Sequence, residues 1–554
     1  MPKRRIRHFK REIRHFKKNN RMMQQSSRPL MRSIEKYLPL LALIAFLPIM
    51  ILRDFSVSNE LRYLSIADEA LLNGDWFTFT NNGVVYADKP PLYLWIVMLG
   101  KALFGQHCMW FISLFSLIPA LITMRVMRNW LVKECPLPDK GWILTSQLML
   151  ITCGLFLGLN VFARMDTLMT LFIVLALHTF FKMFRGEGNF KTQSFLFGLY
   201  TFLAIFTKGP VGILMPLLCP LVFLLYKREA RSFFHYWNWR MFLTVVVLCG
   251  AWFLCVYLED RNTDYLQNLL FHQTAGRAVD AFHHKKPFYF YLIQIWPNLA
   301  PYSLLLVGII AVGMFKHRLT SDTEHFWNAT IWTTFVMLSL ASGKLGVYLA
   351  PIVPFFVFLT AALIRKFPWN GWLAASVAFP AGVMVLALPA LVGIVLFSDL
   401  SYLGQPFFYI AAGIFSIAGV LAIISIKQRN LRKALNTIGF SILIGAFAGG
   451  FSIPALNPWI GYRDLCEKAV ELKEEKGLEH FYSIYLRRSE NTDVFLGEDI
   501  RQLDNQKDAV NQIENLHNTV LLLPERQIEK RQSLKTYLQG KEYHAVGPYR
   551  IVLL

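Results

Sequence analysis

Charged residues are scarce in this chain of 554 residues. Only 17% of its residues are charged, whereas soluble globular proteins carry about 25%. Hydrophobic residues make up 55% of the chain and aromatic residues 15%. This composition excludes an ordinary water-soluble enzyme, an intrinsically disordered chain and a collagen-like rod. We therefore expect a protein that crosses a membrane several times.

Cysteine pairs and zinc motifs are also missing. The seven cysteines are an odd number, and no CxxC or Cys/His spacing joins them. Six lie in or beside apolar segments, and Cys466 stands alone in the polar tail. Neither a disulfide framework nor a zinc knuckle is supported by this pattern.

Acidic residues are fewer than basic ones, 36 against 57, which gives a net charge of +21. Residues 1–32 hold twelve Lys or Arg and one acid, whereas residues 458–554 hold 14 basic and 16 acidic residues. The positive excess therefore lies in the N-terminal segment and in short loops. Cations in such loops usually set the orientation of a membrane protein, so we do not expect nucleic-acid binding.

Fourteen apolar runs are candidates for helices, and a crossing needs about 20 apolar residues. The run 91–104 is short and follows Lys89-Pro90-Pro91, so we expect it to lie along the membrane. With that run removed, the basic loops all fall on the side of the basic N-terminus. The sequence thus predicts thirteen crossings within residues 37–457, a cytoplasmic segment 1–36 and a tail on the outer side. The thirteen runs are 37–52, 107–127, 142–161, 167–184, 194–207, 210–226, 240–258, 289–315, 325–341, 346–365, 371–397, 406–426 and 434–454.

The tail, residues 458–554, has the pattern of a small α/β domain outside the membrane. A helix is expected at about Arg463–Lys476, and strands near Phe481–Leu486, Thr519–Leu523 and Tyr549–Leu554.

Five of the predicted outer loops each contribute at least one cation. Cations that converge beside a bilayer, with acids among them, suit a lipid phosphate better than a diffusible metabolite. The first loop, 53–106, also carries the acids Glu60 and Asp88, which could act as a general base or anchor the loop by ion pairs. Asp166 could equally cap the next helix. The loop residues are Asn59, Glu60, Arg62, Tyr86, Asp88 and Lys89 in the first loop, Arg164 and Asp166 in the second, Lys208 in the third, Arg277, His283, His284, Lys285 and Lys286 in the fourth, and Lys344 in the fifth, with Tyr348 one turn later.

Several of these residues stand in motifs whose order resembles the aminoarabinose transferase family of lipid A. The resemblance runs from about residue 37 to 454, and the two motifs of the first loop carry most of its specificity. The motifs are Asn59-Glu60-Leu61-Arg62-Tyr63, Asn73-Gly74-Asp75-Trp76, Tyr86-Ala87-Asp88-Lys89-Pro90-Pro91, Asp166, Thr207-Lys208-Gly209, His284-x-x-Pro287-Phe288 and Ser342-Gly343-Lys344.

The resemblance implies a GT-C glycosyltransferase fold, related to the protein O-mannosyltransferases, in a bacterial inner membrane. It implies a sugar transferase that takes a polyprenyl-phosphate sugar as donor and a lipid A-like glycolipid as acceptor, at a cavity facing the periplasm. By the same resemblance, Lys89, Lys208 and Arg62 would bind the lipid phosphate, and Tyr348 would contact donor or acceptor. The remaining residues implied to line the cavity are Glu60, Tyr86, Asp88, Asp166, His284 and Lys344.

The chain departs from the family at two acids. The family has Asp where this chain has Asn59, and that Asp is its expected catalytic carboxylate. Because an amide cannot accept a proton at neutral pH, Glu60 or Asp88 takes the role, the acceptor is itself an anion, or the chain is an inactive relative. The family's Glu before Lys89 is Asp88 here. Some relatives hold a metal in this region, so the resemblance leaves open a divalent metal near Asp88 and His284.

Three other functions are compatible with the sequence. The first is a protein O-glycosyltransferase of the same fold, which would differ only in its acceptor. The second is a polyprenyl-lipid flippase or transporter, although the internal repeats and intramembrane charges typical of transporters are not evident. The third is a non-catalytic membrane scaffold.

Overall fold

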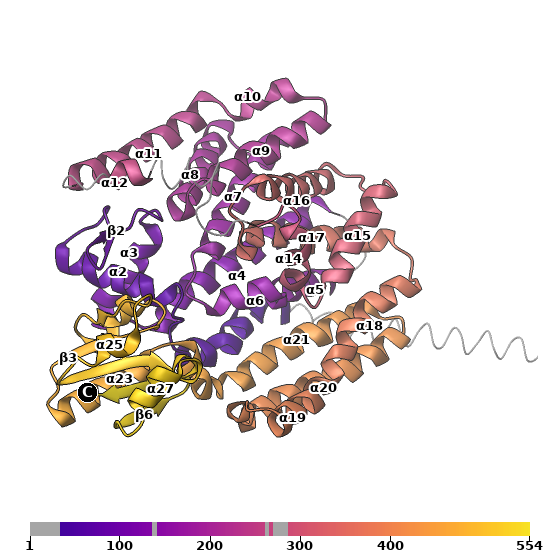
Figure 1. Ribbon diagram of the computed structural model, residues 1–554. Coiled ribbons are helices and arrows are strands. Elements are labelled where there is room, and N and C mark those ends of the chain that lie inside the picture. Colours follow the sequence, from indigo (N-terminus) through magenta and orange to yellow (C-terminus); the bar gives the residue numbers. More distant parts are fainter. Residues whose placement is uncertain (1–33, 136–140, 261–264, 270–285) are drawn as a thin grey trace, which may run out of the picture.

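The computed structural model describes residues 34–135, 141–260, 265–269 and 286–554, and helices dominate them (Figure 1). Eight helices of this described part are long and apolar enough to cross a membrane. They are Ile34–Leu52, α4 (Met109–Glu134), α7 (Asp166–Phe184), α11 (Trp239–Glu259), Gly346–Lys366, Gly371–Phe397, α20 (Pro406–Lys427) and α21 (Leu431–Gly450). A ninth span results if α5 (Gly141–Thr152) and α6 (Gly154–Val161), bent by 63°, are taken together.

The other predicted crossings also coincide with helices, but these are shorter or more polar. They are α8 (Phe190–Lys208), α9 (Val211–Tyr226), the pair α14 (Phe290–Leu299) and α15 (Ser303–Phe315), and α16 (Asp322–Leu340). The helical, polytopic fold class is confirmed, whereas the count of thirteen crossings stays a prediction. The predicted basic segment 1–36 lies almost entirely outside the described residues.

The first loop folds into two short helices and a hairpin instead of a crossing. Helix α2 (Glu60–Asn73) packs against α3 (Leu92–Phe104). Strands β1 (Thr80–Asn81) and β2 (Val84–Val85) come between these helices in the sequence. The 13 residues of α3 extend about 20 Å, too short for a hydrocarbon core of about 30 Å. This length agrees with the prediction that 91–104 does not cross.

The helical bundle has a dry centre and an apolar outer surface. All residues of α17 (Val353–Leu363) are buried, and α4, α5, α15 and α16 contact it. By contrast, α19 (Ala387–Phe397), which follows α18 (Gly371–Val385), has only apolar residues and buries none of them. An apolar helix without a buried face is stable only against lipid. Both observations agree with a membrane protein.

The tail forms the predicted small α/β domain, drawn in yellow in Figure 1. Its five-stranded sheet has the order β4-β3-β5-β7-β6, parallel from β4 to β5 and antiparallel from β5 to β6. The strands are β3 (His480–Ser483), β4 (Arg501–Gln502), β5 (Thr519–Pro524), β6 (Tyr543–Val546) and β7 (Tyr549–Leu553), with α23 (Arg463–Lys476), α24 (Asp493–Leu496), α25 (Ala509–Ile513), α26 (Glu525–Lys530) and α27 (Gln532–Leu538) around them. The expected helix at Arg463–Lys476 is confirmed at both ends.

The tail domain is docked on the first loop. Buried residues of α2, α3, α23 and β5 share one hydrophobic cluster. Ser65 of α2 donates a hydrogen bond of 3.0 Å to Asp493, and the backbone N–H of Arg463 donates one of 3.0 Å to Asp54. Burial raises the pKa of both carboxyl groups, that of Asp493 to about 6. This docking brings residues of the tail to the cavity described next.

Candidate functional site

A cavity of about 420 Å³ lies where the first loop, the ends of several helices and the tail domain meet. It gathers most of the residues that the sequence singled out, from segments far apart in the chain. Its walls are Ser58, Asn59, Arg62, Tyr63, Asp88, Lys89, Leu155, Arg164, Met165, Asp166, Lys208, Gln294, Asn298, Leu345, Gly346, Val347, Tyr348, Arg487 and Arg488. Six of these residues are cations and two are acids. The cavity therefore carries an excess of four formal positive charges and is suited to an anion.

One end of the cavity is formed by an ion pair between two helix termini. Asp166 is the first residue of α7 and Lys208 the last of α8, and their side chains form a buried ion pair. Each charge has the sign that its helix terminus favours, because the macrodipole is positive at the N-terminus and negative at the C-terminus. Gly209 ends α8 with a φ of +86°, a conformation that side chains disfavour. Arg164 also contacts Asp166, at 3.0 Å.

Aromatic rings hold two of the cations in place. The ammonium group of Lys208 lies 4.8 Å from the ring centroid of Tyr348, which belongs to η3 (Gly346–Ile352). The guanidinium group of Arg62 lies 5.0 Å from the ring centroid of Tyr86. Burial raises the pKa of the Tyr86 hydroxyl, so this ring is neutral and contributes its π face.

Glu60 is buried, and its carboxylate is bound by Arg53 and by backbone N–H groups. Its two carboxylate oxygens accept hydrogen bonds of 2.8 Å from the Arg53 guanidinium, and the backbone N–H groups of Ser56 and Ala163 also donate to them. Both side chains of this ion pair are at most 3% exposed. The geometry favours an anchoring role for Glu60, whereas Asp88 lies in the wall of the cavity. Asn59 also lines the cavity, with its Oδ1 3.5 Å from Arg62.

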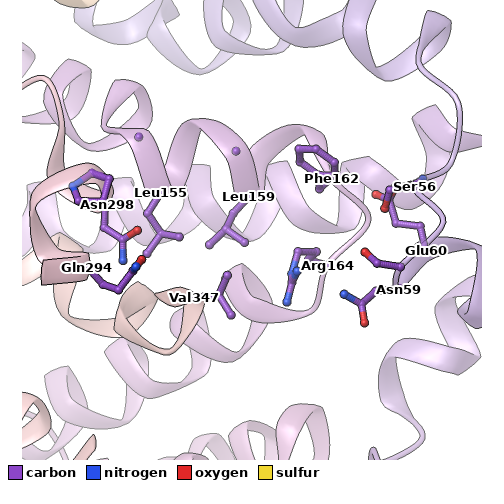
Figure 2. A pocket seen from close by; sticks show the side chains of 14 residues that line it. Ser56, Asn59, Glu60, Leu155, Leu159, Phe162, Arg164, Gln294, Asn298 and Val347 are labelled. Carbon is purple, nitrogen blue, oxygen red and sulfur yellow. Dashed lines mark hydrogen bonds between the residues drawn. The ribbon is translucent and has the colours of Figure 1, made fainter. Parts of the chain in front are cut away.

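A second cavity, of about 460 Å³, adjoins the first and shares Asn59, Arg164 and Val347 with it. Figure 2 shows Leu155, Gln294 and Asn298 at one end, Asn59, Glu60 and Ser56 at the other, and Leu159, Val347 and Arg164 between them. Helix α6, which is bent by 63° from α5, supplies apolar wall residues, and α14 supplies the two amides. The second cavity thus has both polar and apolar walls and adjoins the cationic cavity.

Two predicted site residues of the described part, Tyr86 and Lys344, line neither cavity. Lys344 does not line either cavity; its Nζ donates to the backbone oxygens of Lys286 and Ala341, at the C-terminal end of α16. Carbonyls at a helix C-terminus attract a cation, which accounts for these contacts, and a role of Lys344 in substrate binding stays a prediction. His284 lies outside the described residues, as do Arg277 and His283.

The metal near Asp88 and His284 stays a prediction, because His284 lies outside the described residues. No group of three His, Cys, Asp or Glu side chains among the described residues has a geometry that could hold a metal ion.

Several polar residues that line the cavity were not among the predicted site residues. Gln294 and Asn298 lie one turn apart on α14, and amides at such a spacing in an apolar run are a signal that could have revealed them. Arg164 stands two residues before Asp166 and is a cation in the same outer loop. Arg487 and Arg488 belong to the tail, and no sequence motif connects them with the membrane domain.

The chain is similar to known bacterial glycosyltransferases. The undecaprenyl phosphate-alpha-4-amino-4-deoxy-L-arabinose arabinosyl transferase of Pseudomonas paraeruginosa is 26% identical over 341 residues, which cover 60% of this chain and 61% of that protein. The protein of the same name from Edwardsiella ictaluri is 24% identical over 405 residues, 70% of this chain and 71% of that protein. The aligned part thus spans less than two thirds of the Pseudomonas protein. No family model matches the chain.

A solved structure matches over nearly the whole chain. The crystal structure of ArnT from Cupriavidus metallidurans bound to undecaprenyl phosphate superimposes with a TM-score of 0.71 at 16% sequence identity, covering 93% of this chain and 97% of that one. The match confirms the predicted fold class, that of the GT-C glycosyltransferases with a small C-terminal α/β domain. The sequence relatives agree with the predicted resemblance to the aminoarabinose transferases.

Proposed function

We propose that the chain transfers a sugar from a polyprenyl-phosphate donor to a lipid A-like glycolipid. The observation that carries this proposal is the excess of four positive charges in a cavity built on the ends of membrane helices. In the reaction, the bond between sugar C1 and the donor phosphate oxygen breaks, and C1 forms a bond to an oxygen of the acceptor. The other product is the polyprenyl phosphate, which gains a negative charge as it leaves.

The cations of the cavity stabilise that leaving group. Fixed positive charges aimed at a developing negative charge lower the barrier because they need no reorganisation during the reaction. Lys208 and Lys89 bind the donor phosphate, and Tyr348 fixes the Lys208 ammonium through its ring. Asp166 and Arg164 hold Lys208 at the end of α8. The apolar wall of the second cavity, Leu155, Leu159 and Phe162, receives the first part of the prenyl chain.

The acceptor decides whether a base is needed. A hydroxyl acceptor must give its proton to a carboxylate, and Asp88 is then the candidate because the oxygens of Glu60 are already bound to Arg53 and to backbone N–H groups. An ionised phosphate acceptor has no proton to lose and needs no base. Asn59 in place of an acid fits the second case, since an amide does not repel an anion. We favour the phosphate of a lipid A-like glycolipid as the acceptor group.

The orientation of the chain belongs to the same proposal. The N-terminal segment lies in the cytoplasm, and the cavity and the tail domain lie in the periplasm at the bacterial inner membrane. The basic loops on the opposite side of the bundle support this orientation through the positive-inside rule.

Reconstitution into vesicles tests the proposed activity. The purified chain is incubated with a polyprenyl-phosphate sugar labelled in its sugar, and with either lipid A or a protein fraction as acceptor. We expect the label to move to lipid A together with release of polyprenyl phosphate. Label in the protein fraction alone would identify a protein O-glycosyltransferase, and donor binding without release would indicate a carrier.

A further inference from the structure

The tail domain places two arginines in the wall of the cavity. Arg487 and Arg488 follow β3 in a tight turn in which Tyr485 and Arg488 both have positive φ, at 58° and 55°. Residues with a side chain avoid this region unless their surroundings hold them there, and such strain gathers at functional sites.

Three contacts of the tail domain hold the turn. The Tyr462 hydroxyl donates to the Arg487 carbonyl at 2.9 Å, and the Tyr485 backbone N–H donates to Asn505 at 2.7 Å. A hydrogen bond of 2.8 Å between Ser483 and Ser489 closes the base of the turn. The position of the two arginines is therefore built into the fold of the domain.

The turn meets a third arginine from the first loop. Arg62 lines the same cavity, and Arg62 is among the charged groups that act on Arg488. Burial, and then the charge of Arg62, lower the pKa of the Arg488 guanidinium. The acid near Arg488 is Glu490, which also accepts a hydrogen bond of 3.0 Å from Gln502. Like charges that face each other across a domain boundary are unfavourable until an anion lies between them.

We propose that Arg62, Arg487 and Arg488 together bind the phosphate group of the glycolipid acceptor, so that the tail domain forms part of the acceptor site. This inference rests on the proposed function. It assigns an acceptor role to the tail domain, and it gives Arg62 to the acceptor instead of the donor phosphate that the resemblance implies for it. Arginine suits the task because its planar guanidinium contacts two phosphate oxygens at once.

The arrangement separates acceptor from donor. Lys208 and Tyr348, proposed for the donor phosphate, belong to the membrane domain, whereas two of the three arginines belong to the domain outside it. Two separate phosphate sites then let one cavity hold the leaving group and the attacking group together.

Kinetics of an arginine series test the assignment. In Arg488→Ala and Arg487→Ala we expect the KM for lipid A to rise about tenfold, the loss of a charge-assisted contact, while the KM for the donor is unchanged. Arg488→Lys should recover part of the loss. Arg526→Ala is the matched control, because Arg526 is an exposed arginine of the same domain that lines neither cavity. A changed donor KM, or an unchanged acceptor KM in both alanine variants, would overturn the proposal.

A binding measurement keeps the inference testable apart from activity. Lipid A should raise the thermal unfolding temperature of the wild-type chain in detergent, and phosphatase-treated lipid A should not. In Arg488→Ala this difference should be lost, whereas the unfolding temperature without ligand should remain close to the wild-type value. Stabilisation by inorganic phosphate but not by lipid A would show a free-phosphate site and refute the acceptor assignment. A wild-type chain that binds lipid A but transfers no sugar to it would refute the proposed function, while the assignment of the phosphate-binding site would still hold.

Discussion

Lys208 and Asp166 form an ion pair that joins the C-terminus of α8 to the N-terminus of α7, the helix directly before it in the chain. The pair leaves Lys208 within the wall of the cavity, where its ammonium also lies over the ring of Tyr348. A carboxylate on one side and an aromatic ring on another fix the cation before any ligand arrives. Preorganisation of this kind is what stabilisation of a leaving phosphate requires.

The first prediction concerns the two lysines of the cavity. Lys208→Ala and Lys89→Ala should each lower kcat about a hundredfold or more, because each removes a fixed charge opposite the leaving group. Arginine at either position should restore only part of the rate, since a planar guanidinium does not match a compact ammonium. Lys133→Ala serves as control, because Lys133 pairs with Glu187 at an exposed site away from the cavity. Near-normal rates of both cavity variants would contradict the role in phosphate binding.

Much of this arrangement could be predicted from the sequence. The helices could be predicted from long apolar runs. Asp166 and Lys208 could be found because each is a charged residue at the beginning or end of such a run. The tail helix Arg463–Lys476 is bounded by its own residues, with Asp464 in the first turn and Gly477 at the end. These features are local, so a pattern within a few residues is enough to find them.

Contacts between distant segments could not be predicted in the same way. Glu60 is bound by Arg53, which comes directly after the first long helix and carries no motif. Lys344 resembles Lys208 in sequence, with a neighbouring glycine and apolar flanks, yet its ammonium donates to the backbone carbonyls of Lys286 and Ala341. The arginines of the tail enter the cavity only because α2 and α24 dock. Each outcome depends on packing between elements that sequence spacing does not encode.

The second prediction concerns the stability of the first loop. Glu60→Gln leaves the buried Arg53 guanidinium without its charge partner, and breaking such a pair costs about 3–5 kcal/mol. The unfolding temperature in detergent should fall clearly. The double variant Arg53→Met/Glu60→Gln should lose less free energy of unfolding than the sum of the losses in the two single variants. A Glu60→Gln chain as stable as the wild type but without transfer activity would instead identify Glu60 as the catalytic base.

The third prediction concerns pH and the docking of the tail. Burial raises the folded-state pKa of Asp493 to about 6, above its ordinary value of 3.8. The folded chain therefore binds this proton more tightly, so the contribution of Asp493 to stability is greatest at low pH and is lost as pH rises through 6. Asp493→Asn, which keeps the shape without the charge, should flatten the change in unfolding temperature between pH 5 and pH 7. An equal slope in the variant would exclude Asp493 as its source.

The fourth prediction concerns orientation in the membrane. Cysteine introduced at Asn82, in the hairpin of the first loop, or at Gln506, in the tail, should react with an impermeant thiol reagent added outside spheroplasts. Both positions are surface residues of the described structure. Cysteine at Gly188, between α7 and α8, should react only after the membrane is opened. Labelling of Gly188 from outside would remove the reason for assigning the cavity to the periplasmic face.

The last prediction concerns proton transfer at the cavity. Asp88→Asn removes a carboxylate there, and Asn59→Asp adds one. If the acceptor is an ionised phosphate, no carboxylate has to accept a proton, and Asp88→Asn should keep substantial activity at saturating donor. Asn59→Asp should then change little or reduce the rate, because a new negative charge repels the acceptor. If the acceptor is a hydroxyl, Asp88→Asn should abolish transfer while polyprenyl phosphate still binds, and Asn59→Asp should raise the rate by supplying a base. Single-turnover rates with bound labelled donor separate the chemical step from binding in both variants. A loss in Asp88→Asn together with a gain in Asn59→Asp would refute the phosphate acceptor and make the hydroxyl the attacking group.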